Sequence, residues 1–329
     1  SALYIPTMSL ITDYWQHSGV RDYAFSTPGL VASDISWQRI ETLDFGIDFS
    51  LFNAFNVTFD WYRRTTKDMI VGMEGLNYNI GATAPSGNFG QLHTDGWEVS
   101  VNYGHMFDNG LSLSVTAALA DAVTIIDEYG SANSIGGWYN GKTYGEIWGY
   151  RVDRLFQNDD FLWQNGELVK ANDQYGQDYK YADGKDYATQ GKITSGNLIS
   201  GPGDVKFKDL NGDGIIDNGL QQVKIWNEEK QIYEPGYGDL DIIGNTTPRY
   251  EYSFRIDAAW KGIDFSMFWQ GIGKRDMLGY SWLTVPGFNI TGDGGSAQCF
   301  VEDFWYETKD ASGNVIDANY DAFYPRAAS

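Results

Sequence analysis

The strongest constraint on the fold of this chain is a strict alternation of apolar and polar side chains in six separate segments. Successive side chains of a β-strand point to opposite faces, so a period of two predicts strands with one apolar face and one polar face. The segments are residues 45–51, 56–62, 95–103, 111–117, 250–257 and 263–269.

The connections between these segments are short at one end and long at the other. Residues 52–55, 107–110 and 260–262 each predict a tight hairpin turn, whereas residues 121–249 and 273–329 form long connections. This asymmetry is typical of outer-membrane β-barrels, which have brief periplasmic turns and long extracellular loops. The polar faces would then line a wet interior and the opposite faces would meet lipid. The charged side chains predicted to line that interior are Asp48, Asp60, Glu98, Arg255, Asp257 and Asp264.

Alternation is also found in soluble antiparallel sheets, so a soluble β-protein is the first alternative. Aromatic side chains near the strand ends favour the barrel, because such rings form girdles at the membrane interface. Packing in an ordinary core is the other explanation for them. These residues are Trp61, Tyr62, Trp97, Tyr103, Trp260 and Trp269.

Composition excludes several classes of protein. The formal net charge of −21 repels nucleic acid, so a nucleic-acid partner is not expected. The single cysteine, Cys299, excludes an internal disulfide. No run of 18 apolar residues predicts a transmembrane helix, and the alternating strands of a barrel build no such run. The chain shows no signal peptide, and we expect it to be part of a longer protein.

The segment from Asp209 to Asp217 has the spacing of a calcium loop. Asp209, Asn211, Asp213 and Asp217 supply oxygens at positions 1, 3, 5 and 9, and the carbonyl of Ile215 stands at position 7. Position 12 holds Leu220 in place of the usual acid, so we expect Asp239 to complete the ligand set from a distance. The alternative is a turn rich in Asp and Asn that holds no metal. Either would fix a long loop in place.

Catalytic residues are not predicted. His17, His93 and His105 have no metal-ligand spacing and no nucleophile near them in sequence, and the Gly-rich stretch 141–149 lacks the Lys-Ser/Thr of a phosphate-binding loop. We therefore expect a protein that is not an enzyme.

Aromatic residues in the connection 121–249 form the candidate ligand site. Flat apolar rings beside Asn and Asp suit sugar faces or extended peptides, although a loop of this length must also pack a small core of its own. The candidate substrate-binding residues are Trp138, Tyr144, Trp148 and Trp163.

Six ordered blocks of sequence resemble the SusC/RagA-type TonB-linked outer-membrane transporters. The match extends through most of the chain. The blocks are residues 35–48 (ISWQRIETLDFGID), 59–70 (FDWYRRTTKDMI), 88–98 (NFGQLHTDGWE), 150–157 (YRVDRLFQ), 203–217 (GDVKFKDLNGDGIID) and 243–248 (IGNTTP).

The chain departs from the family pattern in three ways. Asp95 stands where the family usually has Asn, and residues 218–238 resemble an insertion that separates Asp239 from the Asp209–Asp217 loop. Counting back from Gly244 nevertheless places Asp239 where the family has its acid. No plug domain, TonB box or final strand is present, and the resemblance implies that they lie elsewhere in the protein. The expected fold is all-β, a transmembrane antiparallel barrel of about 22 strands of which this chain supplies a part.

The resemblance also implies a function. It predicts import of oligosaccharides across the outer membrane, with a SusD-like surface lipoprotein above the barrel, outer-membrane lipid around it and the TonB complex as the source of energy. Oligopeptides are the alternative substrate. A surface β-protein that binds glycans without transport, a secreted glycoside hydrolase and a passive porin are the competing functions.

Overall fold

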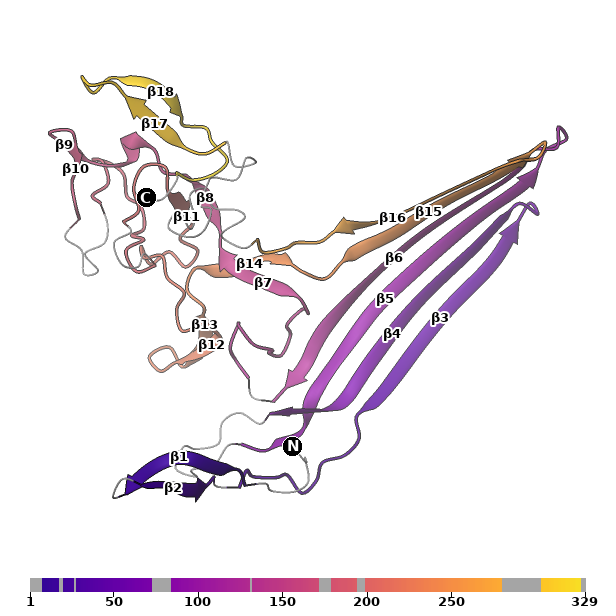
Figure 1. The fold of residues 1–329 in the computed structure, drawn as a ribbon, viewed down its shortest axis with the longest axis horizontal. Coiled ribbons are helices and arrows are strands. Elements are labelled where there is room, and N and C mark those ends of the chain that lie inside the picture. The colour runs from indigo at the N-terminus through magenta and orange to yellow at the C-terminus, as the bar shows by residue number, and fades with distance from the viewer. Residues whose placement is uncertain are drawn as a thin grey trace. The chain divides into compact units, whose positions relative to one another are not determined.

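The computed structural model describes residues 8–17, 20–26, 28–72, 84–130, 132–171, 179–193, 199–279 and 303–326 (Figure 1). The chain divides into two compact units. The first contains Ser1–Glu146 and Asn245–Asp276, and the second contains Ile147–Gly244 and Met277–Ser329. Cys299 and much of the predicted connection 273–329 lie outside the described residues.

The first unit is built on a six-stranded antiparallel sheet in the order β16-β15-β6-β5-β4-β3 (Figure 1). A separate hairpin, β1 (Leu10–His17) and β2 (Val20–Phe25), precedes it. The sheet strands are β3 (Arg39–Leu51), β4 (Phe55–Gly72), β5 (Ser86–Met106), β6 (Ser112–Tyr129), β15 (Arg249–Trp260) and β16 (Ile263–Lys274). Among the described strands, β3 and β16 each pair on one side only, so the sheet is open at both edges.

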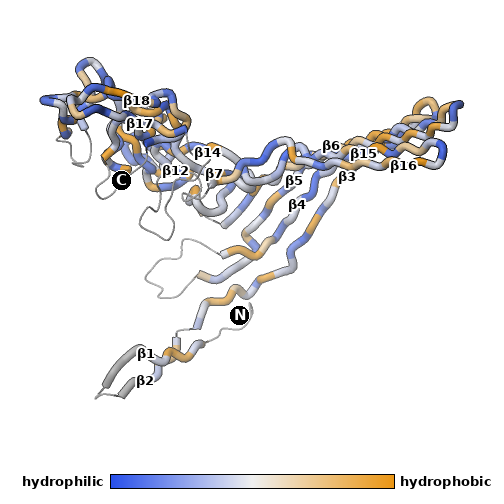
Figure 2. The backbone as a smooth tube through the Cα atoms, turned by 45° about the horizontal axis from the view of Figure 1, so that its top comes forward, coloured by the Kyte–Doolittle hydropathy of each residue, from blue (hydrophilic) through white to orange (hydrophobic). Residues whose placement is uncertain are grey.

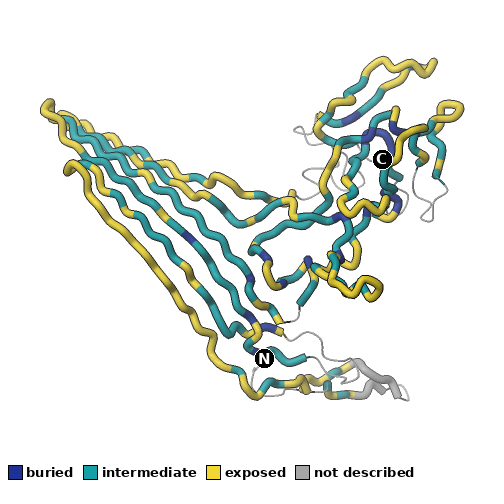
Figure 3. Tube along the Cα trace, turned by 180° about the vertical axis from the view of Figure 1, so that it is seen from behind, coloured by how far each residue is buried: buried dark blue, intermediate teal, exposed yellow. Residues whose placement is uncertain are grey.

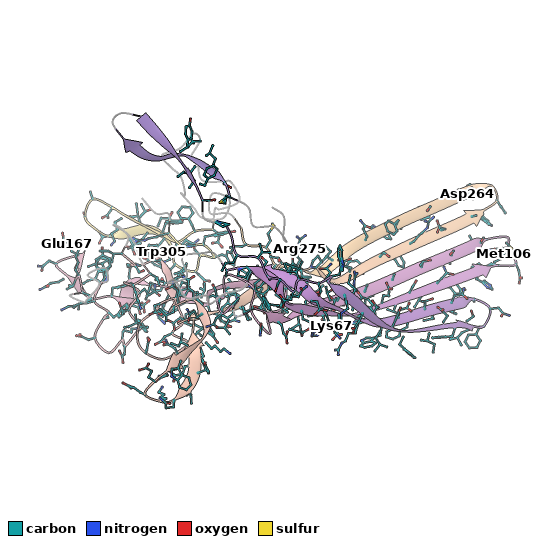
Figure 4. The ribbon with its side chains drawn as sticks, turned by 90° about the horizontal axis from the view of Figure 1, so that it is seen from below. Lys67, Met106, Glu167, Asp264, Arg275 and Trp305 are labelled. Atoms are coloured by element: carbon teal, nitrogen blue, oxygen red, sulfur yellow. The ribbon has the colours of Figure 1, made fainter. Side chains whose placement is uncertain are left out.

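All three hairpins predicted from alternation are confirmed. β3 pairs with β4, β5 with β6, and β15 with β16, in antiparallel register. The first turn uses Phe52 and Asn53 at φ of 55° and 52°, and the third uses Gly262 at φ of 85°, which are backbone conformations that reverse a strand tightly. Figure 4 shows Met106 and Asp264 at the turn end of the sheet, whereas Lys67 and Arg275 lie at its other end.

The register aligns like side chains across the whole sheet. One row runs from Ile47 through Phe59, Val99 and Leu119 to Tyr252, all on one face. The adjacent row, on the other face, contains Asp48, Thr58, Ser100, Ala118, Ser253 and Gln270. Figure 2 shows the resulting alternation of hydropathy along the strands. The sheet therefore has one apolar and one polar face, as predicted.

The apolar face is left largely uncovered within the described part of the chain. Phe45, Phe265 and Tyr252 remain 63%, 52% and 48% exposed, although large apolar side chains normally find a partner. Figure 3 shows that exposure is greatest along the edge strand β3. A soluble sandwich would bury this face against a second layer. The exposed face instead suits a lipid solvent.

The apolar band ends at a defined height on β4 and β5. Trp61 lies directly opposite Trp97, and two residues further along the same face Arg63 forms a bidentate ion pair with Asp95 at 2.6 Å. β4 has 18 residues and β5 has 21, whereas about 9–11 tilted residues cross a bilayer. The strands therefore continue well beyond the apolar band.

β6 has two different neighbours along one of its edges. β15 pairs with β6 only between Ser112 and Ala120. Beyond that point the chain after β6 folds back along the same edge, where the Tyr144 N–H donates to the Thr124 carbonyl and the Gly141 N–H donates to the Ile126 carbonyl. β6 itself runs to Tyr129, which is nine residues into the predicted connection 121–249.

Lys142 holds this returning segment in shape. Its side chain is buried, and Nζ donates to the carbonyls of Ile135 at 3.1 Å and Gly137 at 2.6 Å. Burial lowers the pKa of Lys142, and the nearby charge of Glu146 opposes that change. The two carbonyls supply the hydrogen-bond acceptors that a buried ammonium group needs.

The second unit consists of small two-stranded sheets around an aromatic core. They pair β7 with β14, β8 with β11, β9 with β10, β12 with β13 and β17 with β18. Phe156, Phe161 and Ile216 are at most 3% exposed, and the rings of Phe156 and Phe161 lie 5.0 Å apart. The strands are β7 (Glu146–Tyr150), β8 (Val152–Leu155), β9 (Trp163–Gln164), β10 (Glu167–Leu168), β11 (Val205–Phe207), β12 (Gln222–Asn227), β13 (Ile232–Gly236), β14 (Leu240–Asn245), β17 (Tyr306–Lys309) and β18 (Val315–Asn319).

Helical structure is limited to a 3-10 turn, η2 (Asn158–Asp160), among the described residues. No described helix has the length and apolar character needed to span a membrane.

Candidate functional site

The polar face of the six-stranded sheet is hollowed near the middle of its strands. A cavity of about 840 Å³ lies there, lined by residues from β4, β5, β6, β15 and β16. Three carboxylates, those of Asp60, Glu98 and Glu251, line the cavity. Ala118 and Ala120 also line it, and their small side chains leave space in it. The prediction that Asp60 and Glu98 lie on the polar face is confirmed by their direct pairing across β4 and β5.

Side-chain hydrogen bonds connect the strands on this polar face. Thr58 donates to Asp48 at 2.6 Å, Asn102 donates to Thr116 at 2.8 Å, and Ser266 donates to Asp257 at 2.6 Å. Arg255 pairs with Asp257 along one strand at 2.7 Å. Polar groups that bond one another in this way stabilise a surface that faces water.

The Asp209–Asp217 loop is a series of turns closed by its own side chains. Asp209 accepts the N–H groups of Gly212 at 2.6 Å and Gly214 at 2.9 Å. Asn211 accepts the N–H of Asp213, and Asp213 accepts the N–H of Ile215. Gly212 and Gly214 have φ of 76° and 81°, which a side chain at these positions would strain. This is the backbone shape that the calcium motif and the metal-free turn share.

Asp239 contacts the loop from a distant position in the sequence, as an acceptor of backbone N–H groups. Its side chain is 0% exposed, and its two oxygens accept the N–H groups of Leu210 at 2.8 Å, Asn211 at 3.4 Å and Asp217 at 2.9 Å. Gly238 makes this close approach possible, because a Cβ there would lie 2.3 Å from the carboxylate of Asp217. Asp239 therefore holds both ends of the loop together.

The carboxylates of this loop are engaged with protein donors. Asp217 accepts the Gly219 N–H at 2.8 Å and forms an ion pair with Lys192. Within the described ranges, no three His, Cys, Asp or Glu side chains are grouped as a metal site would require. Burial raises the pKa of the Tyr150 hydroxyl, and the negative charges of Asp217 and Asp239 raise it further.

The four predicted ligand aromatics do not form a single platform. In the first unit Trp138 packs between Tyr129 at 5.4 Å and Tyr144 at 5.9 Å, so it supports the returning segment after β6. Tyr144 is 49% exposed. In the second unit Trp148 packs on Tyr237 at 5.0 Å, and the two rings contribute to local packing.

Trp163 is the more open of the two second-unit candidates. It is 39% exposed, donates from Nε1 to the Asn158 carbonyl at 2.8 Å and lies 5.7 Å from the ammonium of Lys309. Trp163 and Tyr144 thus keep surface that a ligand could contact, whereas Trp138 and Trp148 are half-buried in ring contacts.

A buried ion pair that the sequence did not reveal fixes the core of the second unit. Asp160 is 1% exposed and accepts both terminal nitrogens of Arg154, at 2.5 and 2.7 Å. The Gln157 N–H and the Tyr187 hydroxyl also donate to it, at 2.8 and 3.0 Å. Burial raises the pKa of Asp160, but these donors outweigh it and the pKa lies below its ordinary value. The carboxylate of Asp160 correspondingly raises the pKa of Arg154.

The Arg154–Asp160 ion pair predicts that the core of the second unit becomes less stable in acid. Because the pKa of Asp160 is lowered by folding, its contribution to stability is complete above the ordinary aspartate value of about 4 and is lost as the pH falls below it. Hydrogen exchange of amides 154–161, corrected for intrinsic rates, is expected to accelerate over the pH interval below about 4. Exchange that stays constant over this interval would refute the assignment, and Arg154→Met should accelerate exchange at neutral pH.

Comparison with known proteins shows which proteins this chain is similar to. Residues 5–141 match the family model of the TonB dependent receptor-like beta-barrel. TonB-dependent receptor P3 of Formosa agariphila is 24% identical over 264 residues, which are 78% of this chain and 23% of that protein. TonB-dependent receptor SusC of Bacteroides thetaiotaomicron is 24% identical over 272 residues, again 78% of this chain and 23% of the relative.

Solved structures support the same fold. The RagAB peptide transporter matches with a TM-score of 0.55 and 13% identity, over 99% of this chain and 29% of that one. The closed-closed state of the RagAB peptide importer matches with a TM-score of 0.53 and 15% identity, over 88% of this chain and 26% of that one. The chain spans about a quarter of the length of the relatives that it matches.

The two-faced sheet and the match of residues 5–141 to the receptor family model together indicate part of a transmembrane antiparallel β-barrel. The chain is similar in sequence to SusC and in fold to RagAB, in agreement with the resemblance of its sequence blocks, and these similarities support an outer-membrane location.

Proposed function

We propose that the protein containing this chain imports oligosaccharides across the outer membrane with energy from the TonB complex. The observation that carries the proposal is the six-stranded sheet. Its apolar face is exposed as a lipid-facing wall should be, and its polar face carries a cavity lined by carboxylates and hydroxyls. Such a face suits the wet interior of a transport barrel.

Dependence on TonB tests this function. Uptake of labelled oligosaccharides, prepared by partial hydrolysis of several plant and algal polysaccharides, is measured in cells with and without the tonB gene. We expect uptake to require both this transporter and TonB. Uptake that survives loss of TonB would point to a passive porin, and retention at the surface without uptake would point to a glycan-binding protein that does not transport.

A SusD-like lipoprotein is the proposed partner at the cell surface. The resemblance of this chain to SusC and to the two-component RagAB importer supports a paired assembly. Co-purification of an epitope-tagged transporter from native membranes should recover a surface lipoprotein in equal amount. Recovery of the barrel without such a lipoprotein would contradict the pairing.

Oligopeptides are the second candidate substrate, because the RagAB structures are those of a peptide importer. Exposed Tyr144 and Trp163, beside hydrogen-bonding side chains, favour a glycan slightly. The same uptake assay with a mixture of labelled decapeptides distinguishes the two, since only one class of substrate should accumulate.

We further propose that calcium binds the Asp209–Asp217 loop and stabilises it. The spacing of Asp209, Asn211, Asp213 and Asp217, with the glycines between them, supports this proposal, and calcium would replace the backbone N–H groups that these side chains accept. For calcium 100-fold above its Kd, bound ion adds about 2.7 kcal/mol of stability. The purified transporter should therefore unfold at a higher temperature in calcium than in EDTA, and Asp213→Asn should abolish the difference. Equal melting in calcium and EDTA would leave the loop as a metal-free turn.

A further inference from the structure

The predicted insertion 218–238 folds into a β-hairpin with an exposed aromatic pair. β12 and β13 place Trp226 directly opposite Tyr233, with ring centres 5.1 Å apart and planes at 64°. Trp226 is 48% exposed and Tyr233 is 64% exposed. The other face of the hairpin, with Val223, Ile225 and Glu234, is half-buried. The hairpin therefore presents its two largest rings to solvent.

The hairpin is anchored at its base by the Asp209–Asp217 loop. The Gly219 N–H donates to the carboxylate of Asp217 at 2.8 Å, and the Leu220 N–H donates to the Gly236 carbonyl at 2.8 Å. A Cβ on Gly236 would lie 2.5 Å from the Ile225 side chain, so the strands approach closely there. The loop thus fixes the origin of the hairpin in the second unit.

The tip of the hairpin is also held by hydrogen bonds. Asn227 accepts the Lys230 N–H at 3.0 Å and donates to Glu234 at 2.7 Å, and the Lys230 ammonium donates to Glu234 at 2.6 Å. An isolated two-stranded hairpin is only marginally stable, so these contacts matter for its order. A ring pair held in this way loses little conformational entropy on binding.

The size of the exposed surface favours a small ligand over a protein partner. A buried aromatic side chain contributes about 150–250 Å². With roughly half of each ring exposed, Trp226 and Tyr233 offer on the order of 200 Å² together. A stable protein interface needs about 800 Å² per partner. The pair suits one or two sugar rings.

The polar surroundings fit a neutral sugar. Lys224 lies with its ammonium 5.1 Å from the Tyr233 ring, on the same face of β12 as Trp226. Gln222 on β12 is also exposed, and the hairpin carries a net charge of only −1, from Lys224 and Lys230 against Glu228, Glu229 and Glu234. Exposed aromatic surface beside hydrogen-bonding groups matches the apolar faces and hydroxyl rims of pyranose rings.

We propose that the β12–β13 hairpin is a glycan-capture element, in which Trp226 and Tyr233 contact a sugar ring of the incoming oligosaccharide. This assignment rests on the proposed oligosaccharide substrate. In this proposal the Asp209–Asp217 loop has a structural role, because it anchors the hairpin that carries the two rings.

The test uses the full-length transporter with its lipoprotein partner in detergent. The complex is incubated with oligosaccharides of four to ten residues from partial hydrolysis of starch, xylan, mannan, fructan and β-glucan, washed, and the retained sugars are quantified by mass spectrometry. The Trp226→Ala/Tyr233→Ala variant should retain about tenfold less glycan, because two stacking contacts are lost. Phe323→Leu, which alters a ring that is 78% exposed elsewhere in the second unit, is the matched control and should bind as the wild type does.

A second variant separates loss of the rings from loss of the hairpin. Trp226→Leu/Tyr233→Val keeps an apolar cross-strand pair and removes the flat faces, so it should show the same decrease. Equal retention by wild type and both variants would overturn the capture element and leave oligosaccharide import standing. Failure of the wild type to retain any glycan would overturn both proposals. Loss of the lipoprotein from the variants would reassign the hairpin to partner binding.

Discussion

A Val99→Arg transporter is expected not to assemble in the outer membrane, whereas the neighbouring Ser100→Arg transporter assembles normally. Val99 lies between Phe59 and Leu119 on the apolar face, and Ser100 lies between Thr58 and Ala118 on the polar face. An arginine facing the middle of the bilayer costs about 2–4 kcal/mol in a β-barrel. The same side chain on the polar face meets water and the carboxylates of Asp60 and Glu98, which line the same cavity as Ser100.

The shift of a gel band upon heating measures this difference. A folded barrel resists unfolding in detergent until it is boiled, so the fraction of unheated protein that migrates as the compact species reports assembly. Val99→Arg should lose that species and Ser100→Arg should keep it. The assignment of faces would be contradicted if both variants assembled, or if Ser100→Arg were the one that failed.

Replacement of Asp239 by alanine is expected to release the Asp209–Asp217 loop. The substitution removes the acceptor of the Leu210, Asn211 and Asp217 N–H groups, which are part-buried. Because an unsatisfied buried group costs about 1–3 kcal/mol and water can partly replace the acceptor here, we expect a local loss at the lower end of the sum, on the order of 3 kcal/mol. Asp239→Asn keeps one acceptor oxygen and should lie between the wild type and Asp239→Ala.

Hydrogen exchange of residues 209–219 checks this prediction, with Asp310 as a matched control. Asp310 also accepts backbone N–H groups, from Ser312 at 2.8 Å and Asn314 at 2.9 Å, but in an exposed hairpin turn where water can replace it. Asp310→Ala should therefore change exchange far less. Similar exchange in the two alanine variants would show that burial of Asp239 does not stabilise the loop.

The sheet could be predicted from sequence because its two environments differ so strongly. Water on one side and hydrocarbon on the other impose a period of two, and a slip of one residue would reverse every side chain. For this reason the alternation around residues such as Ile47, Phe59 and Val99 predicted the hairpins and the face that each side chain occupies. The proximity of Asp239 to the loop could be expected from its spacing to Gly244, whereas its hydrogen bonds with the backbone N–H groups of the loop were found only in the structure.

The second unit was less predictable because its order comes from contacts between distant residues. Arg154, Asp160 and Tyr187 have no common spacing, and only folding brings them together around one buried carboxylate. The returning segment after β6 was missed for a similar reason, because the buried Lys142 reads in sequence as a surface residue. The β12–β13 hairpin carries only weak alternation, so its exposed ring pair could be recognised only in the structure.

The position of spin labels relative to lipid tests the central claim most directly. The claim is that alternate side chains of these strands face hydrocarbon and water. Labels placed singly at positions 99 and 101 of β5 and at position 117 of β6 should collide freely with oxygen and poorly with a water-soluble nickel chelate, in transporter reconstituted in bilayers. Labels at positions 98, 100 and 118 should show the opposite ratio. Equal ratios at odd and even positions along β5, or a reversal of the two sets, would contradict the account.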